Sequence, residues 1–307
     1  MIPVLSRRLG SRRRYPVCAL AVLLCCAAMP ANAAQSPVVP ATVQAPVRIA
    51  AMPGDRLLVS DNTLQAIIVI DRKTLSVERT IPVGGRPVAV VWAEGRIFVG
   101  NETLGQVQIY SPDGRLTGNF GAPGSIGLPN ALAYDDQTYE VLVLDALEKV
   151  VKVFTIEGQF LRLLTQPGAL ANPTAMSFDR TARRVLVSDF GTLAGSIFSR
   201  PKPVVHQLDL AGTEVAKIDG TGTGTFVRPQ GLALDAAGRL YVVDSYDSRI
   251  YVFDAAGAPL GNLGGFGGDP GQLSLPLDIL DSPKDKTLYV TDHGNGRIAA
   301  FPEWVTP

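Results

Sequence analysis

One short pattern recurs six times along this chain of 307 residues. Each copy has a proline, an apolar strand, a turn and a second apolar strand that ends in aspartate or asparagine. The prolines are Pro46, Pro87, Pro129, Pro173, Pro229 and Pro276. The strand-end residues follow at a similar interval, as Asp61, Asn101, Asp145, Asp189, Asp244 and Asp292. Repeats of roughly 40 to 45 residues built from short strands are typical of a β-propeller, with one four-stranded sheet per repeat.

The pattern predicts an all-β domain over residues 34–307, a six-bladed β-propeller whose blades begin near residues 46, 87, 129, 173, 229 and 276. The last unit shows only three strands, near 276–280, 287–291 and 297–301. We expect residues 36–45 to supply its fourth strand, because an N-terminal strand added there would cover an otherwise open sheet edge.

Residues 1–33 have the three parts of a secretory signal peptide. A basic region runs from Arg7 to Arg14, an apolar region too short to span a bilayer covers 18–28, and Ala31-Asn32-Ala33 fits a cleavage site. We therefore expect a periplasmic or secreted protein. The general secretory route is favoured over the twin-arginine route, because Pro16 stands where an apolar residue is usual.

Composition then limits the chemistry of the mature chain. All three cysteines lie within the signal segment, so disulfides, thiolate metal sites and cysteine nucleophiles are not expected. Removing the segment changes 28 basic and 28 acidic residues to 23 and 28, and no basic patch predicts a nucleic acid partner. No later apolar run is long enough for a transmembrane helix. A monomer without a cofactor is the expectation.

Two positions break the regularity of the inner strands. Two residues after each proline the side chain is small, except at Arg48 in the first unit and Asp278 in the last. These units become neighbours when the ring closes. We predict that the two charges pair across this seam, and the alternative is that each is separately solvated at the channel mouth.

The fifth unit resembles an NHL repeat, over residues 228–245 and 249–254, and the glycine-rich segment 264–273 is similar to the one that precedes such repeats. The first unit departs from this, since residues 69–75 and 81–84 resemble the YVTN type, whose rings often have seven blades. Seven blades is therefore the alternative to six. The resemblance implies a propeller of the bacterial envelope that serves as a binding or scaffold module.

The strand-end residues are predicted to be structural, because a short carboxylate or amide that ends a strand can accept hydrogen bonds from turn amides. Their recurrence in every unit supports this interpretation. Since propellers host unrelated functions, the fold alone assigns none.

An enzyme is the alternative function. Propeller lactonases and esterases hold calcium through oxygen ligands, and the candidates here are Asn130, Asn172 and Asp278. Half of the residues directly after the six prolines are apolar, so a calcium cage is not predicted. His293 could act as a lone general base, as in lyase-like propellers, although such a histidine is more often an exposed loop residue.

The most distinctive local feature is a long loop in the fourth unit. Asp189 and Val204 are fifteen residues apart, whereas their counterparts Asp244 and Ile250 are six apart. The predicted binding residues in and beside this loop are Phe190, Phe198, Arg200, Lys202, Arg228 and Arg249. Aromatic residues and arginine are favoured at interfaces. The alternative is a loop that only caps the channel.

These patterns favour an exported, non-enzymatic propeller that binds a protein partner in the cell envelope through the loops at one rim. A metal-dependent lactonase or esterase, or a lyase that uses His293, remains the competing hypothesis.

Overall fold

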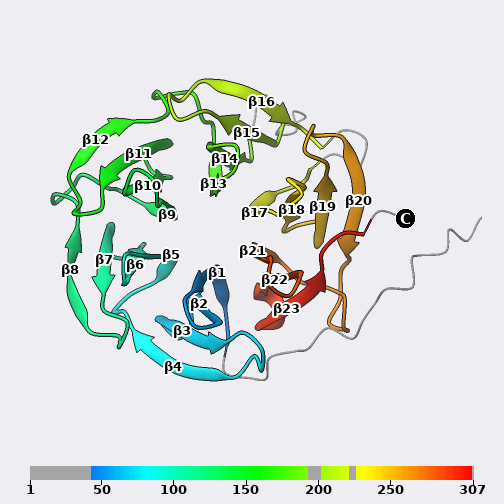
Figure 1. Cartoon of the computed structure of the whole chain (residues 1–307), viewed down its shortest axis with the longest axis horizontal. Coiled ribbons are helices and arrows are strands. Elements are labelled where there is room, and N and C mark those ends of the chain that lie inside the picture. Colours follow the sequence, from blue (N-terminus) through cyan, green and yellow to red (C-terminus); the bar gives the residue numbers. More distant parts are fainter. Residues whose placement is uncertain (1–42, 193–201, 221–225, 306–307) are drawn as a thin grey trace, which may run out of the picture. The chain divides into compact units, whose positions relative to one another are not determined.

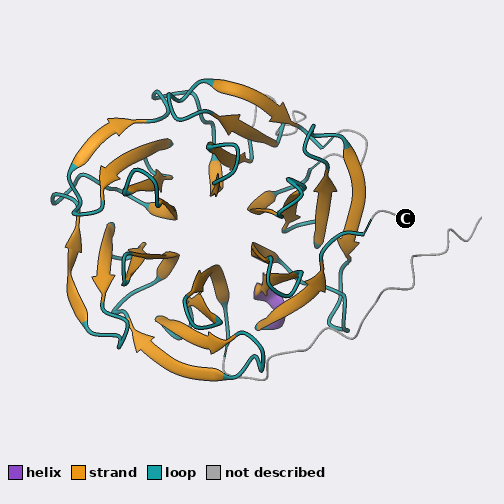
Figure 2. Ribbon diagram, viewed as in Figure 1, coloured by secondary structure: helices purple, strands orange, loops and turns teal. Residues whose placement is uncertain are grey.

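The computed structural model describes residues 43–192, 202–220 and 226–305. Within these residues the chain forms 23 strands and one short 3-10 helix, η1 (His293–Asn295). Strands and that one helix are coloured separately in Figure 2. No helix among the described residues is both long and apolar enough to cross a bilayer.

Five blades have four strands each in the described chain. Blade 1 contains β1 (Pro46–Met52), β2 (Arg56–Asp61), β3 (Ala66–Asp71) and β4 (Val77–Pro82). Blade 2 contains β5 (Pro87–Ala93), β6 (Arg96–Asn101), β7 (Gln106–Tyr110) and β8 (Leu116–Phe120). Blade 3 contains β9 (Pro129–Asp135), β10 (Glu140–Asp145), β11 (Val150–Thr155) and β12 (Phe160–Leu163).

The remaining blades follow the same plan. Blade 4 contains β13 (Pro173–Asp179), β14 (Arg184–Asp189), β15 (Val204–Leu208) and β16 (Glu214–Ile218). Blade 5 contains β17 (Pro229–Leu234), β18 (Leu240–Asp244), β19 (Arg249–Phe253) and β20 (Pro259–Gly264). Blade 6 contains β21 (Pro276–Ser282), β22 (Thr287–Asp292) and β23 (Arg297–Pro302).

The blades form a closed ring around an axis (Figure 1). Within each blade, consecutive strands pair antiparallel and the first strand lies innermost. The prediction of an all-β, six-bladed propeller is confirmed, and the seven-bladed alternative is wrong. The YVTN-like sequence of the first unit folds as an ordinary four-stranded blade. This local resemblance was therefore no guide to the number of blades in the ring.

Each inner strand begins at the proline of its repeat. Proline has no backbone N–H to donate, so it fits the first residue of a strand, where one fewer ladder bond is needed. The register is irregular just after the proline in all six blades. Such bulges re-aim the side chains beside them, and in blades 1 and 6 those side chains are Arg48 and Asp278.

The hydrophobic core lies between the blades. Six buried clusters are found, and each joins the facing sheets of two neighbouring blades. Between blades 2 and 3, Phe98 and Phe154 pack on either side of Phe120, with ring centroids 5.5 and 5.3 Å from that of Phe120. Burial of this apolar surface is the main force that holds neighbouring blades together.

The seam between blades 6 and 1 has a core cluster of its own, in which buried Val43 packs with Ile298 and Ala300. On the face away from the prolines, Arg72 of blade 1 forms an ion pair of 2.9 Å with Asp285 of blade 6. Residues 36–42 of the expected closing strand lie outside the described residues, so that strand stays a prediction.

Candidate functional site

Two sets of loops meet at one end of the ring. Pro46 pairs with Asp61 and Pro229 with Asp244, and the other four blades have the equivalent pair. The loops that enter the inner strands and those that join the second and third strands therefore share one face. We call this face the proline rim, because rims of this kind are where propeller loops can bind.

The strand-end residues fasten these two loops together. Oδ2 of Asp61 accepts hydrogen bonds from the backbone N–H groups of Gln44 and Ala45, at 2.6 and 3.0 Å. Its Oδ1 accepts from Thr63 and Leu64 in the loop that follows. The equivalent residues of blades 2 to 5 make backbone hydrogen bonds to both loops, whereas Asp292 accepts from the backbone of Ser274 in the first loop and from the side chain of Asn295 in the second. All six residues are buried: Asp61, Asn101, Asp145, Asp189, Asp244 and Asp292.

The electrostatic setting of these carboxylates differs between blades. Lys152 reaches Asp145 at 2.8 Å, and Arg297 reaches Asp292 at 2.6 Å. Burial acts to raise the pKa of Asp189, but His206 and three backbone amides lower it to about 2. The main hydrogen-bond donors to Asp244 are all backbone amides, and burial raises the pKa of this carboxyl group.

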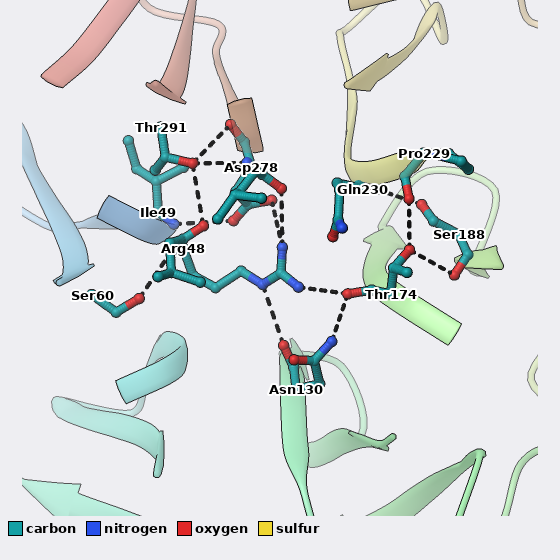
Figure 3. A network of polar contacts seen from close by, with 12 residues as sticks. Arg48, Ile49, Ser60, Asn130, Thr174, Ser188, Pro229, Gln230, Asp278 and Thr291 are labelled. Atoms are coloured by element: carbon teal, nitrogen blue, oxygen red, sulfur yellow. Dashed lines mark hydrogen bonds and ion pairs between the residues drawn. The ribbon is translucent and has the colours of Figure 1, made fainter. Parts of the chain in front are cut away.

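Arg48 occupies the axis of the ring (Figure 3). It starts in blade 1, and its guanidinium donates to three backbone carbonyls in three other blades. These are Asn130 O at 3.2 Å in blade 3, Thr174 O at 2.6 Å in blade 4 and Leu277 O at 3.1 Å in blade 6. Only 6% of Arg48 is exposed. The side chain is therefore a central tie between four blades.

Asp278 lies beside this guanidinium, with Oδ1 4.0 Å from Nη1 of Arg48. Its Oδ2 accepts a hydrogen bond of 3.0 Å from the backbone N–H of Ile49. Burial lowers the pKa of Arg48 and raises the pKa of Asp278, and each charge offsets part of the other's shift. The structure thus brings together the two residues that break the inner-strand pattern, and the alternative of two separately solvated charges is wrong.

Hydroxyl groups extend the same network around the axis. Thr291 Oγ1 donates to Val47 O at 3.2 Å across the seam, while Thr174 Oγ1 donates to Pro229 O at 2.7 Å. Ser188 Oγ donates to the carbonyl of Gln230 (Figure 3). The inner strands are therefore held to one another by polar contacts as well as by packing.

The candidate calcium ligands are engaged within the protein. Asn130 donates from Nδ2 to Thr174 O at 2.7 Å, and Asn172 donates from Nδ2 to Gly191 O at 2.6 Å. Asp278 is the partner of Arg48 and Ile49. Within the described residues, no group of three or more His, Cys, Asp or Glu side chains is arranged to hold a metal ion.

His293 stands at the seam on the proline rim, in η1. Its Nδ1 lies 3.1 Å from Pro46 O, so the ring bridges blade 6 to the start of blade 1. A backbone carbonyl can only accept, so Nδ1 carries the proton in this contact. The contact gives this histidine a structural role at the seam.

A second arginine, Arg228, lies on the rim between blades 4 and 5. Its guanidinium carbon is 5.4 Å from the ring centroid of Phe190 and 5.2 Å from that of Tyr246. Nη1 also donates to Tyr246 Oη at 3.4 Å. Contacts of this kind with two rings hold an arginine in place while part of its guanidinium stays accessible.

The other predicted binding residues fall into two groups. Lys202 is exposed, and Arg249 is exposed with an ion pair of 3.5 Å to Asp247. Phe198 and Arg200 lie outside the described residues.

Tyr246 and Val227, which are 59% and 46% exposed, were not among the binding residues predicted from the sequence. Tyr246 comes two residues after the strand-end Asp244, and Val227 comes two residues before Pro229. Both residues could have been noticed in the sequence. They are large apolar or aromatic residues at loop positions, outside the strands whose apolar residues form the buried core. We call Phe190, Lys202, Val227, Arg228 and Tyr246 the rim patch.

Comparison with known proteins supports the fold. A chain of hydrazine synthase from Kuenenia stuttgartiensis aligns with a TM-score of 0.62 and 14% identity, over 88% of this chain and 98% of that one. A structural genomics protein of unknown function from Bacteroides thetaiotaomicron aligns with a TM-score of 0.68 and 17% identity, over 87% and 72%. At such identities the likeness shows the fold alone. Curated protein sequences give no match.

The sequence of blade 5 matches a described repeat. Residues 226–253 match the model of the NHL repeat. These residues include β17, β18 and β19, the three inner strands of blade 5. The chain is therefore a six-bladed β-propeller that carries an NHL repeat in its fifth blade.

Proposed function

We propose that the protein is an exported, non-enzymatic module that binds a protein partner through the rim patch of blades 4 and 5. The observation that carries the proposal is the arrangement around Arg228, where two aromatic rings flank a cation beside exposed Val227. Aromatic residues and arginine dominate the energetics of protein interfaces.

The axis supports this choice. Arg48 fills the axis, and its guanidinium donates hydrogen bonds to backbone carbonyls and lies beside Asp278. A side chain that satisfies buried groups of the fold stabilises the ring and is a poor candidate for binding a substrate. The rim patch differs, because Lys202, Val227 and Tyr246 are exposed and Phe190 and Arg228 are half-buried.

Export is part of the proposal and rests on the signal-like residues 1–33. The enzyme alternative has less support. His293 Nδ1 is held by Pro46 O, and Asn130, Asn172 and Asp278 are held by other groups of the fold. A general base at His293 would have to act through its other ring nitrogen, because Nδ1 is engaged with Pro46 O.

Two tyrosines of nearly equal exposure give a matched test. Tyr246 lies on the proline rim and is 59% exposed, whereas Tyr139 lies on the opposite face and is 55% exposed. A photo-crosslinking amino acid is placed at each position in turn, and cells that produce the full chain are irradiated. We expect one discrete adduct from position 246 and none from 139. Equal crosslinking at both positions, or none at 246, contradicts the proposal.

A further inference from the structure

We infer that the rim patch recognises an acidic peptide segment, in which a carboxylate binds Arg228 and an adjacent apolar side chain packs on Val227 and Tyr246. This inference rests on the proposed function and adds the chemistry of the partner.

The guanidinium of Arg228 is already held in place by its neighbours. Phe190 and Tyr246 contact its guanidinium, and Tyr246 Oη takes one donor of Nη1. The backbone at this point is also fixed, since Arg228 N donates to both carboxylate oxygens of Asp244 at 3.0 Å. An arginine has five donors in a planar fork that matches a carboxylate, and a fork that is already oriented loses less entropy on binding.

Arg228 and Lys202 lack an internal carboxylate partner in the part of the chain that the structure describes. The nearest acid in sequence to Tyr246 is Asp247, which pairs with Arg249 and accepts a hydrogen bond from Tyr251. The neighbouring carboxylate is therefore already occupied, and the charge of Arg228 is left for a ligand.

Lys202 extends the positive charge onto blade 4. Its backbone lies against Gly191, where an added Cβ would come within 2.7 Å of the Lys202 carbonyl oxygen. Gly191 follows Phe190 directly, so the backbone of Lys202 lies next to the residue that follows Phe190, and Phe190 in turn contacts Arg228. Two cations on this part of the rim complement a segment that carries more than one carboxylate.

Arg86 shows what an ordinary arginine does at the equivalent position. It precedes Pro87 in blade 2 as Arg228 precedes Pro229 in blade 5. Arg86 pairs with Glu102 of its own blade at 3.1 Å. In blade 5 the residue that corresponds to Glu102 is Ser245, whose hydroxyl donates to the carbonyl of Arg228 at 3.3 Å. The exchange of acid for serine removes the internal partner of Arg228.

A peptide fits this surface better than a nucleic acid. Phosphate backbones are bound by extended rows of unpaired Lys and Arg. Outside the rim patch the rim instead presents Glu102 beside Arg86, Asp247 beside Arg249 and the exposed Glu148. A short acidic segment meets the patch alone, whereas a long polyanion also meets these carboxylates.

The test is a selection from a random peptide library displayed on phage, panned on the purified wild-type protein and on the R228Q and R86Q variants. We expect wild type and R86Q to enrich peptides with Asp or Glu next to a large apolar residue, and R228Q to lose this enrichment. Peptides without acids, identical peptides from R228Q, or no enrichment with wild type would overturn the inference.

The strongest enriched peptide is then measured by fluorescence anisotropy. We expect R228Q to weaken its binding by about tenfold to a hundredfold, as the loss of charge-assisted hydrogen bonds predicts. R86Q should bind as wild type does. Single-stranded oligonucleotides serve as the competing ligand, and binding tighter than the peptide contradicts the inference. If position 246 crosslinks a partner while acidic peptides fail, the proposed function stands and only the acidic class is wrong.

Discussion

Two arginines of this propeller show how differently the same side chain can be used. Arg48 lies in the axis, is 6% exposed, and donates to carbonyls of three blades besides facing Asp278. Arg228 lies on the rim between two aromatic rings and pairs with no carboxylate among the described residues. The first is bound by the protein's own groups, whereas the second has no such carboxylate partner and is the arginine that we propose binds a ligand.

The contrast follows from where each residue stands in the repeat. Arg48 replaces a small residue two positions after the proline, at the narrowest part of the ring, where a buried charge must be paired. Arg228 stands before the proline, where the chain is still in the rim loop. The position in the repeat therefore accounts for the structural role of Arg48 at the axis and leaves Arg228 in the rim loop, where we propose that it binds.

The largest effect is expected at the axis. Replacing Arg48 with methionine leaves Asp278 buried without its counter-charge and removes one donor from each of three carbonyls, of which Thr174 O keeps a second donor, the Asn130 side chain. Breaking a buried pair in this way costs about 3–5 kcal/mol of unfolding free energy. Urea denaturation of R48M against wild type measures it.

The double variant R48M/D278N separates the pair from the packing. Because no charge is then left unpaired, we expect the double variant to lose less stability than the sum of the two single variants. A loss below about 1 kcal/mol for R48M would show that the axis tolerates an empty centre, and the contrast between the two arginines would then fail.

The next effect concerns the space that Asp278 needs. Gly231 of blade 5 faces it so closely that an added Cβ would lie 2.4 Å from both Cα and Oδ1 of Asp278. G231A should therefore destabilise the protein by about 1–3 kcal/mol. Gly118 is the matched control, since nothing lies within 4 Å of its added Cβ. Equal denaturation midpoints for G231A and G118A would contradict close packing at the axis.

A smaller effect, dependent on pH, is expected at the strand-end carboxylate of blade 4. His206 Nδ1 lies 2.8 Å from Glu214 and its Nε2 3.6 Å from Asp189. Burial opposes the charged ring, but these two carboxylates raise the pKa of His206 above 6.5. Its stabilisation is thus complete below pH 6.5 and is lost as the pH rises through the folded-state pKa.

H206Q should consequently lose about 1 kcal/mol of unfolding free energy in mildly acidic solution and less as the pH rises. Tyr251 occupies the equivalent place in blade 5, opposite Val242 as His206 is opposite Val187. The control Y251F should show no such slope over the same range. A difference between H206Q and wild type that is constant with pH contradicts the pairing.

The sequence predicted the frame of the molecule well, for a physical reason. Proline suits the first residue of a strand, and a buried aspartate at a strand end can fasten the two loops beside it. Since each blade needs the proline and the strand-end residue, both recur in every repeat. Their positions therefore predict the number of blades and the face on which the two sets of loops lie. The charges at Arg48 and Asp278 were informative because they violate the same pattern.

Other features depend on distances that a sequence does not contain. The reach of Arg48 to Asn130 and Thr174 follows from the narrow axis of the ring, which brings residues 82 and 126 positions away into contact. Tyr246 was overlooked because its ring matters only through Arg228, which reaches it from another loop. Phe190 and Arg228 were predicted as binding residues from the sequence, and the contacts described at the rim add Tyr246 to them.

The smallest effect on stability is expected at the rim, where Arg228 is compared with Arg48 of the axis. R228Q removes contacts to two rings at a half-buried position, which costs at most about 1 kcal/mol of unfolding free energy. R86Q removes a surface ion pair and should cost about as little. In the photo-crosslinking experiment at position 246, however, R228Q should reduce the adduct strongly and R86Q should not. If R228Q instead destabilises the protein as much as R48M, the rim arginine is also a tie of the fold and has no charge to offer a partner.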